Sequence, residues 1–434
     1  MEGSSGVFAD MEPSYDAAKE RPSIICVADP LPFTGGGLRT LRSLKEYSKH
    51  FKTHLFLPYS LSRRGVREAI KELAGYNIRI AGYNYYPNLI HRVRVLGEIV
   101  LYLFPATMRP HIGIDDFYAV VVLHEIFEAI YTGSIIGNLL GIPKIGLLQL
   151  PPFYSSKKRL HNILRAIILW RHLLAGNPLT GKLLELEGLA RFNTTYKLGA
   201  TRIRKLLEEY STLIAVSKSI PYEMGSEWTS RVISLDPGVS LDESDLNAMV
   251  TIKSRSVKKG SYVVFGGRPS AEKGLAEALV AFSLISRHCR DLKLVVTGHV
   301  RKNTLLGLKR ACKKLRVEDK VVFTGFLPRW RRFEIIAKAR LMLYPSHVDS
   351  FSYAVFESLH LGTPVVGYRI PALETYYSRQ PGVKLVEEGD LEALTVEAVN
   401  ILEKGIEAVE PPEIKSWREI MEDEVAIIKR AIGV

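Results

Sequence analysis

The chain has little cysteine. Its 434 residues include three, Cys26, Cys289 and Cys312, which lie far apart without a C-x-x-C spacing. This excludes a disulfide framework, gives no zinc-site pattern and fits a reducing compartment. No uncharged apolar run reaches the roughly 18–20 residues that span a bilayer. The first twenty residues are acidic and small, without the basic and apolar regions of a signal peptide, so we expect a flexible leader over 1–20.

Two motifs of ligand-binding α/β enzymes are also absent. The stretch FTGGGLRTL (33–41) lacks the G-x-G-x-x-G spacing, and the second predicted strand ends in LFLPYS without an acidic residue for a ribose. Both points disfavour a dinucleotide-dependent dehydrogenase. No D-x-D-like cluster follows a predicted strand, because Asp115 and Asp116 precede one. We therefore expect no metal site.

Positive charge is in excess. The formal net charge is +13, and residues 151–210 hold eleven Lys or Arg against four Asp or Glu. Such a balance indicates an anionic partner, but the basic stretch lacks interleaved aromatics, which disfavours nucleic acid. Its segment 157–174 predicts a helix with an apolar face. That face is formed by Leu160, Ile163, Leu164, Ile167 and Ile168, with Trp170 nearby.

A basic amphipathic helix suits an anionic membrane surface, and the alternative is an ordinary helix packed on its own domain. A second apolar and basic stretch, 91–105, favours the membrane. We expect a cytoplasmic protein that is peripheral on the cytoplasmic face of the membrane.

Apolar β-branched runs alternate with helical patterns, which predicts parallel α/β sheets. Ten runs form two sets of predicted strands: 23–29, 53–59, 118–124, 144–150 and 212–217, then 262–267, 292–298, 321–326, 341–346 and 364–370. The fold class is α/β, with two Rossmann-like, doubly wound parallel-sheet domains that face a cleft. The stretch 232–245 is the expected connection. Ligands of such sheets bind at the carboxyl ends of the strands.

Glycines and cations follow predicted strands at two places. Gly36 and Gly37, after the first strand, allow a ligand to approach the backbone at a helix start, or they form only a tight turn. In GGRPSAEKG (266–274), Gly267 ends a strand and is followed by Arg268 and Lys273. A guanidinium, an ammonium and helix amides together suit a diphosphate, whereas a solvated loop is the alternative.

Two carboxylates and a histidine complete the set of candidate residues. In YPSHVDSFSYAVFESLHLGTPVV (344–366), Asp349 and Glu357 lie eight residues apart across a predicted helix start. Glu357 faces a ligand hydroxyl or simply favours the helix dipole. His124 ends the buried strand YAVVVLH, where it is either structural or part of the site.

The glycine-rich first loop, the GR…KG loop and the carboxylate pair before a GxPVV strand occur here in an order that resembles GT-B fold retaining glycosyltransferases, glycosyltransferase family 4 (group 1). The resemblance covers most of 23–400 and is strongest over 262–376. It departs at Asp349, where the family has glutamate, and at Ser350 and Ser352, where glycines usually flank the phenylalanine.

The resemblance implies a role for each of these residues. Arg268 and Lys273 hold the donor diphosphate, Glu357 binds the ribose, and His124 contacts the transferred sugar. The catalytic residues are then His124, Asp349, Arg268 and Lys273. The donor-binding residues are Gly36, Gly37, Gly267, Arg268, Lys273, Ser350, Phe351, Ser352 and Glu357.

It also implies a division of the chain. Residues 21–228 form the acceptor-side domain, 229–411 the nucleotide-sugar domain, and 412–434 a helix that packs back on the first domain. The implied reaction is a metal-independent hexosyl transfer with retention, by front-face attack and without a covalent intermediate. A UDP- or GDP-linked sugar is the donor substrate, no other cofactor is needed, and the acceptor is a lipid-linked or other glycan.

Two alternatives stay open. A GT-B sugar-nucleotide epimerase would give product without an acceptor. An inactive nucleotide-binding subunit is compatible with the shorter carboxylate at Asp349.

Overall fold

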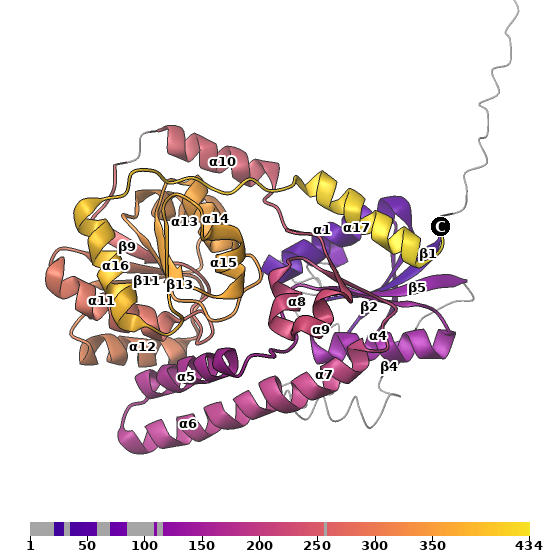
Figure 1. Cartoon of the computed structure of the whole chain (residues 1–434), viewed down its shortest axis with the longest axis horizontal. Helices are drawn as coiled ribbons and strands as arrows, with labels where there is room; N and C mark the ends of the chain where they lie inside the picture. Colours follow the sequence, from indigo (N-terminus) through magenta and orange to yellow (C-terminus); the bar gives the residue numbers. More distant parts are fainter. Residues whose placement is uncertain (1–20, 30–34, 59–69, 85–107, 111–115, 256–257) are drawn as a thin grey trace, which may run out of the picture.

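The computed structural model describes residues 21–29, 35–58, 70–84, 108–110, 116–255 and 258–434. The predicted leader 1–20 and the apolar stretch 91–105 lie outside the described residues. Two α/β domains lie side by side, and the C-terminal helix returns to the first of them (Figure 1).

The first domain is built on a sheet of eight described strands in the order β4-β3-β2-β1-β5-β6-β7-β8. The strands are β1 (Ser23–Val27), β2 (Lys52–Leu57), β3 (Ile78–Asn84), β4 (Met108–Pro110), β5 (Phe117–Val122), β6 (Lys144–Leu148), β7 (Thr212–Ala215) and β8 (Val232–Ser234). All neighbouring strands pair in parallel except β3 and β4. Every residue of β1 is buried, as expected for a central parallel strand.

Helices of the first domain begin and end at residues that favour these positions. They are α1 (Gly35–His50), α4 (Phe127–Leu140), α5 (Lys157–Leu174), α6 (Pro178–Phe192), the π-helical η3 (Asn193–Gly199), α7 (Ala200–Leu207), α8 (Ser219–Met224) and α9 (Ser226–Thr229). The Ser156 side chain caps α5, and α6 begins with an Asn177 cap and Pro178 in its first turn. Gly141 ends α4 in the left-handed conformation.

The second sheet has the order β11-β10-β9-β12-β13-β14, all parallel. Its strands are β9 (Tyr262–Phe265), β10 (Lys293–Thr297), β11 (Val321–Gly325), β12 (Met342–Tyr344), β13 (Val365–Tyr368) and β14 (Val383–Val386). The helices that follow the first domain are α10 (Glu243–Ser254), α11 (Leu275–His288), α12 (Lys302–Lys314), α13 (Arg329–Lys338), α14 (Tyr353–His360), α15 (Pro371–Tyr377), α16 (Leu391–Lys404) and α17 (Trp417–Ala431).

All ten predicted strands are present, and the structure corrects the predicted connection between the domains. Residues 232–245 are not loop throughout, because they begin as β8 and end in α10. Since β8 pairs with β7, the first sheet extends past the boundary predicted at residue 228.

Helix α5 leaves the first domain and packs against α11 and α12 of the second, while α6 packs on α5 (Figure 1). The side chains of Ile163 and Ile167 are buried in a small core with Phe192 of α6 and Ala271 of the second domain. The prediction that these two isoleucines contact a membrane is therefore wrong. Their face is covered by the chain itself, as the packing alternative requires.

The charges of α5 are also largely engaged within the protein. The Arg159 guanidinium is buried, pairs with Glu223 and Glu388, and donates a hydrogen bond to the His347 carbonyl at 2.5 Å. Lys158 pairs with Glu387 at 3.0 Å. Glu223 belongs to α8, whereas Glu388 and His347 belong to the second domain, so Arg159 ties the two domains together.

Helix α17 closes the molecule against α1. Its Glu424 is buried and accepts hydrogen bonds from Arg39 and from the Tyr47 hydroxyl. Arg39 also donates to the Gly238 carbonyl at 3.1 Å, in the connection between the domains. The start of α1 therefore contacts both segments that join the two domains.

Candidate functional site

Both sheets reverse their strand order at one point, and ligands of doubly wound sheets bind at such points. In the first sheet the chain runs outward from β1 to one side and from β5 to the other, so the reversal lies between β1 and β5. In the second sheet it lies between β9 and β12. The candidate residues from sequence follow these four strands and no others.

Gly36, His124 and Gln149 gather at the first of these points. A Cβ on Gly36 would lie 2.9 Å from the Gln149 Oε1 atom and 4.0 Å from the His124 Nε2 atom. A side chain at Gly36 would therefore displace the Gln149 amide from its position. Gly37 follows, buried in the first turn of α1.

Gln149 fixes this arrangement and was missed by the sequence analysis. Its amide donates 2.8 Å hydrogen bonds to the Thr40 hydroxyl and to the Leu123 carbonyl. Its own backbone N–H donates to Glu125 at 3.0 Å. These bonds tie the end of β6 to the end of β5 and to α1. The predicted strand 144–150 ended beside Gln149, but nothing in the sequence pattern singled it out.

His124 is partly exposed at the end of β5. Its Nδ1 atom lies 3.4 Å from the Glu125 carboxylate, and 22% of its side chain is exposed. Nδ1 accepts or donates no hydrogen bond among the described residues. Nδ1 is buried beside Glu125, so the ring atom that faces a group placed beside Gly36 is Nε2.

Arg268 and Lys273, at the second reversal point, differ in their contacts with the rest of the protein. Lys273 Nζ donates to the Val348 carbonyl at 2.7 Å and to the Asp349 carboxylate at 2.8 Å. Arg268 is exposed and makes no hydrogen bond or ion pair with the described residues. One cation of the predicted pair is fixed in place and the other is available to an incoming anion.

Glycines make this loop possible. Gly274 has φ +74°, and a Cβ there would lie 1.9 Å from the Pro345 carbonyl oxygen. Gly267 has φ +123°, a conformation that other residues rarely adopt. The loop after β9 and the loop after β12 consequently approach closely, which brings Lys273 beside Asp349.

Asp349 is saturated with protein partners. Besides Lys273, its carboxylate accepts hydrogen bonds from the Tyr344 hydroxyl and from the backbone N–H groups of Ser350 and Ser352, the last two at 3.0 and 3.1 Å. Burial by itself would raise the Asp349 pKa, but Lys273 and these hydrogen bonds hold it below its usual value. Asp349 thus orders the loop and positions Lys273.

Ser350 and Ser352 contribute to this loop through their backbone conformation and hydrogen bonds, whereas the Phe351 side chain belongs to the core. The Ser350 carbonyl accepts a 2.9 Å hydrogen bond from Ser219 of the first domain. Ser352 takes φ +72° and caps α14, so it adopts the conformation for which glycine is the usual choice. The Phe351 ring is buried among other aromatic rings. The predicted contact between Phe351 and the donor can therefore involve only the backbone of Phe351.

Glu357 is a buried carboxylate with one free oxygen. Its side chain is 1% exposed, and Oε1 accepts a 2.5 Å hydrogen bond from Arg332 of α13. Oε2 is buried and has no partner among the described residues. Burial raises the Glu357 pKa, partly opposed by Arg332 and Arg329. An unpaired buried acceptor is costly unless a ligand donor reaches it.

The two reversal points are adjacent across the domain junction. A Cβ on Gly35, at the start of α1, would lie 3.5 Å from the Tyr353 ring at the start of α14. The Tyr376 hydroxyl donates to the Asp236 carboxylate at 2.5 Å, and the Ser219–Ser350 bond lies in the same junction. The first-domain and second-domain candidates therefore border the same domain junction.

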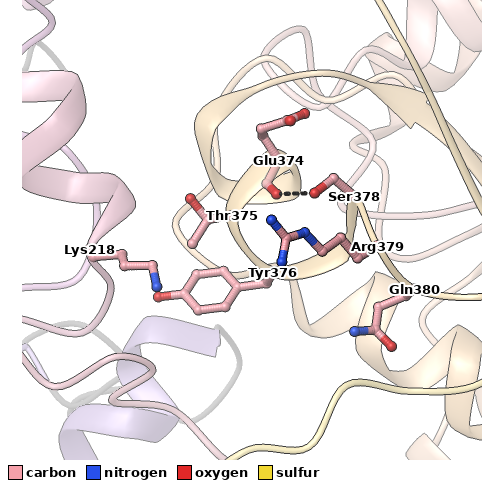
Figure 2. A pocket seen from close by; sticks show the side chains of 7 residues that line it. All are labelled: Lys218, Glu374, Thr375, Tyr376, Ser378, Arg379 and Gln380. Carbon is pink, nitrogen blue, oxygen red and sulfur yellow. Dashed lines mark hydrogen bonds between the residues drawn. The ribbon is translucent and has the colours of Figure 1, made fainter.

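A pocket of about 450 Å³ lies at the domain junction, and Figure 2 shows the residues that line it. It is lined by Lys218 of the first domain and by Glu374, Thr375, Tyr376, Ser378, Arg379 and Gln380 of the second. Glu374 pairs with Arg369 at 2.6 Å. None of the predicted donor-binding residues lines this pocket.

Other features of the described residues bear on the predicted metal and membrane properties. Over the described ranges, no three His, Cys, Asp or Glu side chains gather as ligands of a metal ion. Asp116 is exposed ahead of β5, and Asp115 is not described. Within the same ranges, no helix is both long and apolar enough to span a membrane.

Solved structures share this two-domain arrangement. Sucrose-phosphate synthase from Thermosynechococcus elongatus superimposes with a TM-score of 0.60 at 12% identity, over 95% of this chain and all of that one. HepE of Anabaena in complex with UDP-glucose gives 0.55 at 12% identity, over 94% and 95% of the two chains. The fold is GT-B.

The second domain also matches a family model. Residues 251–405 match the model described as glycosyl transferases group 1. These residues include every second-domain candidate of this GT-B chain, from Gly267 to Glu357.

Curated relatives are glycosyltransferases. 2-Deoxystreptamine glucosyltransferase of Streptomyces kanamyceticus is 24% identical over 52% of this chain and 57% of its own length. Alpha-monoglucosyldiacylglycerol synthase of Streptococcus pneumoniae is 30% identical over 30% of each chain. The alignments thus span between 30% and 57% of the length of these relatives.

Proposed function

We propose that this GT-B protein is a glycosyltransferase that moves a hexosyl group from a nucleotide sugar, UDP- or GDP-linked, to an acceptor. One observation carries the proposal. Cations, glycines, a histidine and a half-satisfied buried carboxylate, which are scattered over the sequence, come together at the two facing points where the sheets reverse. The group 1 match over 251–405 supports the same chemistry.

The proposed donor lies across the second reversal point. Arg268, free in the described structure, and Lys273, held by Asp349, bind the diphosphate, and the amides at the start of α11 add to their charge. The free Oε2 of Glu357 accepts a ribose hydroxyl. Leaving-group charge grows on the diphosphate in the transition state, and fixed cations stabilise it there.

The transferred sugar then lies toward the first domain, where His124 and the start of α1 contact it. The acceptor enters from this side, and its hydroxyl attacks on the face that the diphosphate leaves. We propose retention of configuration without a metal ion or a covalent intermediate, on the strength of the resemblance to glycosyltransferase family 4.

The acceptor is proposed to be lipid-linked, with the enzyme bound peripherally at the cytoplasmic face of the membrane. The positive excess over residues 151–210 supports an anionic surface. The name of one relative, a monoglucosyldiacylglycerol synthase, includes a lipid acceptor. Others act on 2-deoxystreptamine by name, so the acceptor is the part of the proposal that needs its own test.

A panel of nucleotide sugars tests the proposal. A donor at about one hundred times its Kd stabilises the folded protein by roughly 2.7 kcal/mol, which a thermal unfolding assay detects. The stabilising donor, labelled in its sugar, is then incubated with the protein and a lipid extract. Labelled glycolipid is the expected product. A sugar-nucleotide isomer formed without acceptor would indicate the epimerase instead, and binding without any turnover would indicate an inactive subunit.

A further inference from the structure

The helices α6, η3 and α7 form one long rod along an edge of the molecule, below α5 in Figure 1. Leu179, Leu183 and Leu186 recur on α6 at a spacing of four and three residues, which places them on one face. Their exposed fractions are 72%, 61% and 62%, and Leu198 of η3 is 63% exposed. We call Leu179, Leu183 and Leu186 the leucine stripe.

The rod does not need this stripe to fold. Its opposite face already packs on α5 through Gly181, Gly188 and Phe192. A Cβ on Gly188 would lie 3.2 Å from Ile167, and one on Gly181 would lie 3.3 Å from His172, so the helices are in close contact there. A contiguous exposed apolar patch beyond the core face marks an interaction surface.

Charge on the rod identifies the kind of partner. Residues 178–207 contain six Lys or Arg and two Glu. Both glutamates are paired with α5, Glu185 with His172 at 3.0 Å and Glu187 with Arg171 at 3.1 Å. Lys182, Arg191 and Lys197 are exposed and make no side-chain ion pair within the described ranges. Exposed leucines therefore lie among uncompensated cations.

We propose that the leucine stripe docks on an anionic lipid bilayer, with the leucines among the headgroups and Lys182, Arg191 and Lys197 against lipid phosphates. Apolar side chains flanked by Lys and Arg suit such a surface, which offers both negative charge and an apolar interior. A second copy of this chain is a poorer partner, because two such faces would bring like charges together. Docking by this surface would bring the enzyme to a lipid-linked acceptor. The inference therefore rests on the proposed function.

Vesicle co-sedimentation of the full chain tests the proposal. The protein binds vesicles of phosphatidylcholine and phosphatidylglycerol at low salt, binds pure phosphatidylcholine more weakly, and is released by salt. Lys182→Glu and Arg191→Glu should each lower the partition coefficient about fivefold or more, since each removes a cation near the lipid. The triple variant Leu179→Ser, Leu183→Ser, Leu186→Ser should lose binding to both kinds of vesicle.

Matched controls are Leu306→Ser and Lys309→Glu on α12, which are also exposed and should leave binding unchanged. The altered side chains are solvent-exposed, so circular dichroism and thermal unfolding should match the parent for every variant. If the parent ignores anionic vesicles at low salt, or the serine variant binds as the parent does, the proposal is wrong.

Two further measurements separate the rival outcomes. If the parent self-associates in sedimentation equilibrium and the serine variant is monomeric without a vesicle defect, the stripe is a contact between copies and the proposal fails. Nucleotide binding should be equal in all variants. Vesicle binding without sugar transfer would overturn the proposed function and leave the docking surface intact.

Discussion

The carboxylate of Glu357 is the residue whose surroundings are hardest to explain without a ligand. It is buried, one oxygen is bound by Arg332, and the other has no partner among the described residues. Arg332 is itself a third exposed and stands on a separate helix. The pair therefore holds one acceptor ready for a ligand hydroxyl while keeping the charge partly compensated.

Glu357→Gln should raise the Kd for the nucleotide about tenfold or more, because a hydrogen bond to a charged group contributes roughly 1.5–3 kcal/mol. Folding should be little affected, since the amide oxygen of glutamine can still accept the hydrogen bond from Arg332, which is a third exposed. Calorimetric titration with UDP and GDP measures the effect. Glu374→Gln, an exposed carboxylate paired with Arg369, is the control. Equal affinities of parent and Glu357→Gln would make Glu357 a structural residue.

Arg268→Ala should slow sugar transfer by more than it weakens nucleotide binding, because the charge on the leaving diphosphate is largest in the transition state. The change should leave stability within about 0.5 kcal/mol, since Arg268 is exposed and unpaired within the described ranges. Arg287→Ala, at the exposed end of α11, is the matched control. The comparison of kcat with Kd decides, and a full rate in the Arg268 variant contradicts the assignment.

At the scale of single residues, the sequence identified the candidates that follow β1, β5, β9 and β12, because apolar runs locate strand ends well. It missed Gln149, Arg332 and Tyr344, which act through contacts with residues distant in sequence. It also gave Asp349 a catalytic role, a prediction that is still untested. In the structure, all of the hydrogen bonds of Asp349 go to protein groups.

Helix α5 is the element that joins the two domains at a distance from the site. Arg159, Glu223, Glu388, His347 and Glu277 form a buried chain of ionisable groups between α5, α8, the second sheet and α11. His347 lies two residues before Asp349, so this network also borders the loop that holds Lys273.

The protonation of His347 should make stability depend on pH. Burial alone would lower the His347 pKa, but hydrogen bonds to Glu277 and Glu388 and their charges raise it to about 8. An unfolded histidine titrates near 6.5, so this contribution is fully present below that pH and is lost as pH rises through about 8. Its size is about 2 kcal/mol.

Urea unfolding across that pH interval measures the effect, and His347→Gln should flatten the dependence. His172→Gln is the control, because His172 is exposed on α5 and only borders the same region. The same slope in the parent and in His347→Gln would show that other groups cause any pH dependence.

The strands that were not predicted from the sequence were missed for a common physical reason. Among the described strands, β4 and β8 lie at the two edges of the first sheet, β3 is next to β4, and β14 is at an edge of the second sheet. These strands are partly exposed or short, so they lack the continuous apolar run by which a buried parallel strand is recognised. The apolar face of α5 was found, but a helical period shows only that a face is apolar, and not what covers it.

At the scale of the whole molecule, the start of α1 couples the site to the chain connections. Arg39 binds Glu424 of α17 and Gly238 of the connection, and Arg42 stacks 3.9 Å from the Trp417 ring. The two doubly wound domains were predictable from the two sets of strands, and the GT-B fold from the family resemblance. The contacts of Arg39 and Arg42 were not predictable, because their partners lie hundreds of residues away in sequence.

Glu424→Ala should destabilise the fold by about 3–5 kcal/mol, because it leaves the Arg39 charge buried without its partner. Chemical denaturation measures the loss. Glu422→Ala, which removes an exposed carboxylate from the same helix, should leave stability almost unchanged. A small effect of Glu424→Ala on the free energy of unfolding would contradict a stabilising role of the Arg39–Glu424 pair.

The central claim is that a nucleotide sugar binds where the two sheets reverse, and a crystal structure of the full chain with the stabilising nucleotide tests it most directly. The account predicts the diphosphate between Gly267 and Lys273, with Arg268 turned onto it and the ribose within hydrogen-bond distance of Glu357. A nucleotide found instead in the pocket beside Lys218 and Arg379, with Glu357 Oε2 unoccupied, would contradict the account.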